Sequence, residues 1–92
     1  MSYRIVWRER IWNNIYAITF ITLQKGGDPA AISHAVTEIE RRLTNAPTDE
    51  GESRADNERV LIVHPVSVTF EVFEAQQIVL IYEAIVYPRQ RA

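Results

Sequence analysis

Histidine is the side chain best suited to proton transfer in this sequence, and it occurs at His34 and His64. The ordinary pKa of an imidazole lies near neutral pH, so either residue could serve as a general acid or base. Neither has a second histidine or a carboxylate at the spacing typical of metal ligands. The sequence therefore predicts no metal site, and His64, which precedes Pro65, is interpreted as a polar turn residue.

Arginines supply the other candidate chemistry, because a guanidinium can bind a phosphate with two parallel hydrogen bonds. Arg54 and Arg59 lie in and after an acidic segment, where ion pairs with the neighbouring acids are favoured over catalysis. Arg89 and Arg91 follow Tyr87 near the C-terminus. For these two, phosphate binding and simple solubility of a frayed terminus are equally well supported.

Composition narrows the class of protein. The 92 residues fit one domain spanning 1–92, and 12 acidic against 10 basic residues give a net charge of -2. That balance argues against non-specific nucleic-acid binding as the main activity. The absence of cysteine excludes thiolate nucleophiles, disulfides and iron–sulfur clusters, so a cytoplasmic location is the simplest expectation and no cofactor is predicted. The apolar stretch 11–23 is too short to span a membrane and lacks the features of a signal peptide.

Apolar periodicity predicts the elements that must position these residues. A period of two indicates strands over 3–7 and 66–73, and runs of apolar residues indicate strands over 60–63 and 78–87. Spacings of three and four indicate helices over 8–24 and from Pro29 to about Leu43. Gly26 and Gly27 end the first helix and Asp28 caps the second. The polar segment 44–58 is expected to be a solvated loop. We therefore predict the order β-α-α-β-β-β, an antiparallel four-stranded α+β sheet with a helical hairpin on one face and the first strand at an edge.

The last predicted strand is apolar on both of its sides. Ile78, Leu80 and Tyr82 share one side, and alternation assigns Val79, Ile81 and Ile85 to the other. A helical hairpin covers only one face of a sheet, so a partner chain or a second copy should cover the other face. Glu83, the only charge in the strand, is expected to meet an arginine because a carboxylate in apolar surroundings is costly unless paired.

Five segments, in their order along the chain, carry a resemblance to a known family: YRIVW, IERRL, GESR, RVLIVHPVSVTFEVF and IVLIYEAIVYPR. Together they resemble the toxins of the RelE/ParE superfamily of type II toxin-antitoxin systems. The resemblance implies a growth-inhibiting toxin neutralised by a cognate antitoxin. RelE-like members cut messenger RNA in the ribosomal A site, whereas ParE-like members are associated with inhibition of DNA gyrase.

The resemblance also implies site residues. The catalytic candidates are Arg54, Arg59, Tyr87 and Arg89. The antitoxin-binding candidates, Leu80, Ile81, Tyr82 and Glu83, come from the strand that is apolar on both sides, and the resemblance supplies the antitoxin as its partner. In the family pattern an arginine commonly opens the strand that leads to an aromatic, and near Phe70 that place holds Ser67. The preceding loop is acidic, which opposes the approach of RNA. Any ribonuclease activity is therefore expected to be weak.

Two alternatives remain at this point. The first is a degenerate, catalytically inactive member of the family that serves only as a protein-interaction module, and the second is an unrelated homodimeric α+β domain. Toxicity on induction separates the first alternative from a toxin, and the mass in solution tests the second.

Overall fold

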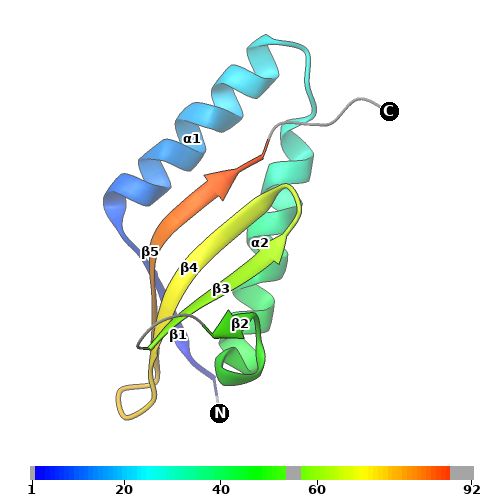
Figure 1. Ribbon diagram of the computed structural model, residues 1–92. Coiled ribbons are helices and arrows are strands. Elements are labelled where there is room, and N and C mark those ends of the chain that lie inside the picture. Colours follow the sequence, from blue (N-terminus) through cyan, green and yellow to red (C-terminus); the bar gives the residue numbers. More distant parts are fainter. Residues whose placement is uncertain (1, 54–56, 88–92) are drawn as a thin grey trace.

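The computed structural model describes residues 2–53 and 57–87, which form two helices beside a five-stranded sheet (Figure 1). The elements, in chain order, are β1 (Arg4–Trp7), α1 (Glu9–Gln24), α2 (Pro29–Asn45), a 3-10 turn η1 (Pro47–Asp49), β2 (Glu52–Ser53), β3 (Glu58–Val63), β4 (Val66–Phe73) and β5 (Ile78–Val86). The predicted α+β class is confirmed.

The helical hairpin forms where the sequence predicts it. Gly26 adopts a φ of 77°, a left-handed conformation that glycine reaches without a steric penalty, and it ends α1. The Asp28 side chain then accepts a hydrogen bond of 3.0 Å from the backbone N–H of Ala30. Pro29 occupies the first turn of α2, where its missing N–H costs nothing.

The sheet differs from the prediction in two respects. Its order is β1-β5-β4-β3-β2, and β1 lies at an edge, as expected, but runs parallel to β5. Alternation is the same in parallel and antiparallel strands, so strand direction could not be read from it. The fifth strand, β2, lies in the predicted loop and pairs with β3 over only two residues, which is too short to show a period.

One hydrophobic core joins both helices to a single face of the sheet. Ile11 and Ile15 of α1 pack in the same buried cluster as Ile39 and Leu43 of α2. The strand residues of this cluster are Leu61, Val66, Val68, Phe70, Val79 and Ile81. Both helices therefore cover one face, as predicted from their apolar stripes.

The outer face of the sheet, on the side away from the helices, carries the strand residues that alternate with those of the core. From β4 it presents Ser67, Thr69, Glu71 and Phe73, and the paired positions on the neighbouring strands include Val60, Ile62, Leu80 and Ile85. The position of Ile85 on this face corrects the sequence prediction, because alternation assigned Ile85 to the same side as Val79 and Ile81. A β-bulge opposite Thr69 and Phe70 leaves Tyr82 as an extra residue in β5, which reverses the alternation beyond it.

Candidate functional site

The structure does not gather the predicted catalytic residues into one place. Arg54 and Arg89 lie outside the described residues. Arg59 is near the start of β3, and Tyr87 directly follows β5, where its backbone N–H donates to the carbonyl of Pro65 over 2.7 Å. From Arg59 to the turn that contains Pro65 the strand runs roughly 16 Å, so the two side chains act at opposite ends of the sheet.

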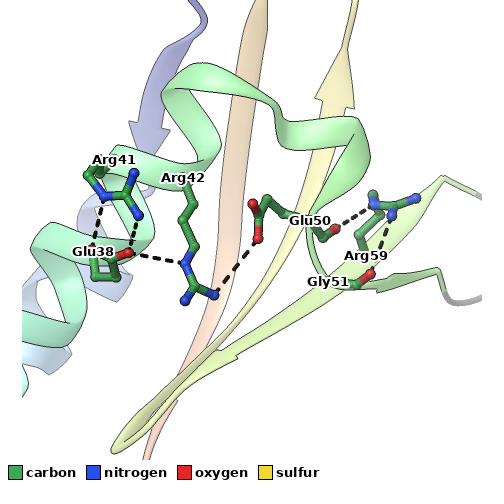
Figure 2. A network of polar contacts seen from close by, with 6 residues as sticks. All are labelled: Glu38, Arg41, Arg42, Glu50, Gly51 and Arg59. Carbon is green, nitrogen blue, oxygen red and sulfur yellow. Dashed lines mark hydrogen bonds and ion pairs between the residues drawn. The ribbon is translucent and has the colours of Figure 1, made fainter.

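Arg59 holds the loop that precedes its own strand. Its Nε donates to the carbonyl oxygen of Glu50 over 2.9 Å, and Nη2 donates to that of Gly51 over 3.4 Å (Figure 2). A Cβ on Gly51 would approach the Val60 carbonyl oxygen to 2.4 Å, so glycine lets this segment lie against β3. The guanidinium is thus engaged with backbone carbonyls, which supports a loop-fixing role over catalysis.

A series of ion pairs connects the loop that Arg59 holds to α2. Glu38 pairs with Arg41 and also with Arg42, whose Nε lies 3.2 Å from a Glu38 carboxylate oxygen (Figure 2). Arg42 reaches on to Glu50, with 3.8 Å between nitrogen and oxygen. The hydrogen bond from Arg41, followed by that from Arg42, lowers the pKa of Glu38 to about 2. These exposed arginines are therefore already paired with carboxylates.

His64 and Tyr87 lie together at the other end of the sheet. Their rings are stacked, with 6.4 Å between centroids and 10° between planes. Both line a groove of about 720 Å³ beneath the C-terminal half of α1, whose floor includes Ile18, Ile32 and Val86. Lys25 and Asp28 also line it. Spacing in the sequence gave no sign of this pair, because the two residues are separated by the whole β4–β5 hairpin.

The predicted antitoxin-binding residues divide between the two faces of the sheet. Leu80 and Glu83 lie on the outer face, and Tyr82 joins them there through the bulge. Ile81 points into the core and is 0% exposed, so it is not available to a partner in this structure. The outer face is apolar around Ser67, where the flanking Ile62 and Ile85 are 58% and 46% exposed. The predicted uncovered apolar surface is therefore present on β5 and its neighbours.

Tyr82 is surrounded by carboxylates on this face. Burial, then the hydrogen bond and charge of Glu58, and then the charges of Glu71 and Glu83 raise the pKa of its hydroxyl to about 12. The guanidinium of Arg8 lies over the ring, 5.8 Å from its centroid. The predicted arginine partner of Glu83 is not found among residues 2–53 and 57–87.

Ser67, which the family resemblance predicts to replace a phosphate-binding arginine, lies on the outer face of β4. It is 6% exposed and lies between Ile62 and Ile85 across the ladder, so this part of the outer face is neutral and apolar. Within the described ranges, no group of three histidine or acidic side chains is arranged to hold a metal ion. Among the same residues, neither helix has the length and hydropathy required to cross a bilayer.

Helix α1 offers a second apolar surface on its solvent side. Tyr16, Phe20, Ile21 and Leu23 are all exposed, and Trp12 packs edge-on against Tyr16 with 5.3 Å between centroids. Only Ile11 and Ile15 of this helix are buried, so its C-terminal half projects beyond the core. Resemblance to the toxin family gave no indication of this surface.

Comparison with known proteins gives a structural match without a sequence match. Neither a protein-family model nor a curated protein matches the sequence. A chain in the crystal structure of the toxin-antitoxin complex RelBE2 from Mycobacterium tuberculosis superimposes with a TM-score of 0.68 at 11% identity. The match covers 94% of this chain and 99% of that one. The chain therefore shares its fold with a chain of that toxin-antitoxin complex.

Proposed function

We propose that this protein is the toxin of a type II toxin-antitoxin system, neutralised by an antitoxin that covers the outer face of the sheet. The fold shared with a chain of the RelBE2 toxin-antitoxin complex supports a toxin role. The observation that carries the proposal is the exposed apolar surface of Ile62 and Ile85 beside Ser67, together with Leu80 further along β5, which residues 2–53 and 57–87 leave uncovered. Exposed apolar patches of this kind mark sites of protein association.

The charge of this face favours a protein target over messenger RNA. Glu58, Glu71 and Glu83 surround Tyr82, and an acidic surface repels a phosphate backbone. Cleavage through a ribose 2'-OH needs a cation beside the scissile phosphate, yet Ser67 takes the expected arginine position and Arg59 is bound to carbonyls. We therefore assign growth inhibition to a protein target, with DNA gyrase as the one that the family offers.

Messenger RNA cleavage is the second candidate, and one observation favours it. His64 and Tyr87 are adjacent, and both types of side chain can transfer protons. A site of this kind would lie at the groove beneath α1 rather than on the outer face. Lys25 lines the same groove and would supply a cation there.

Induction of the chain in a bacterial host tests the proposal. Growth, incorporation of labelled amino acids and plasmid supercoiling are followed in parallel. The proposal predicts growth arrest with early loss of gyrase supercoiling and with intact messenger on ribosomes. Early cleavage of ribosome-bound messenger would instead support the nuclease, and unchanged growth would leave an inactive interaction module.

A further inference from the structure

The outer face carries an arrangement of carboxylates that is unfavourable in the isolated chain. Glu58 of β3 lies directly opposite Glu71 of β4, and Glu83 of β5 lies opposite Thr69 of the same strand. Like charges that face each other across a ladder destabilise a sheet. All three carboxylates contribute to the raised pKa of Tyr82, so their charges lie around one part of the surface.

Within residues 2–53 and 57–87, none of the three carboxylates forms an ion pair. The ion pairs there link Arg41 and Arg42 to Glu38 and Glu50, at the end of α2. Arg59 is occupied by backbone carbonyls, and Arg8 lies over the ring of Tyr82. The carboxylates are also not arranged as a metal site. Separate cations from another molecule would satisfy them.

Apolar side chains border the carboxylates on both sides. Leu80 pairs directly with Glu71, and Ile62 and Ile85 flank Ser67, which is the outer-face position of β4 next to Thr69. Such a surface gains from burial as well as from charge neutralisation. A polyanion would be repelled, and a small cation would leave the aliphatic side chains exposed. A segment with interleaved basic and aliphatic residues satisfies both requirements.

We propose that the outer face binds a basic amphipathic segment of the antitoxin, in which arginine or lysine side chains meet Glu58, Glu71 and Glu83 while aliphatic side chains cover Leu80 and Ile85. This inference rests on the proposed function and specifies the chemistry of its partner. It also sets the expected charge of the antitoxin segment, which is positive where it contacts this toxin.

Model peptides test the chemistry without the antitoxin. Three peptides of equal length alternate leucine with arginine, glutamine or glutamate, and each is titrated against the full chain by fluorescence anisotropy, together with a single-stranded oligouridylate. The arginine peptide should bind at least about tenfold more tightly than the glutamate peptide. Its affinity should fall about tenfold in the double variant Glu58→Gln/Glu71→Gln and fall as salt is raised.

Glu74→Gln is the matched control, because Glu74 is an exposed acid in the β4–β5 turn, outside the cluster. It should bind the arginine peptide as the unmodified chain does. Equal binding of all three peptides, equal loss in Glu74→Gln, or tight binding of the RNA would overturn the inference. Circular dichroism of the double variant verifies that its fold is retained.

Growth assays separate this inference from the proposed function. If the chain arrests growth and the antitoxin neutralises the double variant as well as the unmodified chain, the basic-segment inference is wrong and the toxin function stands. If the chain does not arrest growth but the arginine peptide binds selectively, the docking chemistry stands and the toxin function is wrong.

Discussion

The ring of His64 stacks on the ring of Tyr87, with 6.4 Å between their centroids. This contact joins the turn after β3 to the end of β5, and the hydrogen bond from the Tyr87 N–H to the Pro65 carbonyl closes the same junction. The pair lies on the wall of the groove beneath α1. The contact brings together two side chains that can transfer protons.

Substitution at Tyr87 distinguishes chemistry from packing at this junction. Tyr87→Phe keeps the ring and removes the hydroxyl, so we expect unchanged stability and unchanged growth arrest. Tyr87→Ala removes the stack and should lower the free energy of unfolding by about 1 kcal/mol, measured by urea denaturation. Loss of growth arrest in Tyr87→Phe, with its fold intact, would place the reaction at the groove.

Arg59 is expected to contribute to stability rather than to toxicity. Arg59→Ala leaves the carbonyls of Glu50 and Gly51 without their donor and should cost about 1–2 kcal/mol in the free energy of unfolding. Arg59→Lys can restore only one of the two bonds and should recover part of the loss. Thermal denaturation measures both. If Arg59→Ala were stable but no longer arrested growth, Arg59 would be a functional cation.

The pKa of Tyr82 provides a test of the acidic cluster by titration. Its folded pKa is about 12 against an ordinary value of 10.0, so the unfolded chain ionises first. Stability linked to Tyr82 is therefore complete below pH 10 and is lost as the pH rises toward 12. Glu58→Gln should lower this pKa toward 10, as read from tyrosinate absorbance, with Tyr82→Phe identifying the signal. An unchanged titration would show that Glu58 does not act on Tyr82.

Local rules predicted the helices and the two long hairpin strands, because their signals lie within a few residues. The cap at Asp28 and the stripe from Ile32 to Leu43 are of this kind. The predicted face of Ile85 was wrong because one extra residue at Tyr82 reverses the alternation in β5. A bulge of this kind cannot be recognised from the pattern of apolar residues.

Features that depend on the path of the chain were not predictable. The parallel pairing of β1 with β5 and the stack of His64 on Tyr87 both join residues that are distant in sequence. The hydrogen bonds from Arg59 to the carbonyls of Glu50 and Gly51 also depend on the path of the chain. An arginine that follows an acidic loop containing glycine is nevertheless a signal in the sequence for a loop-fixing role. Leu80 and Ile81 were assigned to opposite faces correctly, because alternation holds on that side of the bulge.

Ile81 and Leu80 are neighbours in β5, but their side chains lie on opposite faces of the sheet. Ile81 is fully buried against the helices, so Ile81→Asp places an unpaired charge in the core and should cost more than about 3 kcal/mol. Loss of cooperative unfolding by circular dichroism is the expected result. Leu80→Asp lies on the outer face and should retain the unfolding transition of the unmodified chain.

Neutralisation through the outer face is tested most directly by rescue of growth with the antitoxin, supplied from a short open reading frame identified upstream or downstream of the gene. The unmodified chain should arrest growth, and co-expression should restore it. Leu80→Asp should still arrest growth but should no longer be rescued, because the substitution disrupts the covered face. Rescue of Leu80→Asp equal to that of the unmodified chain would contradict neutralisation through the outer face.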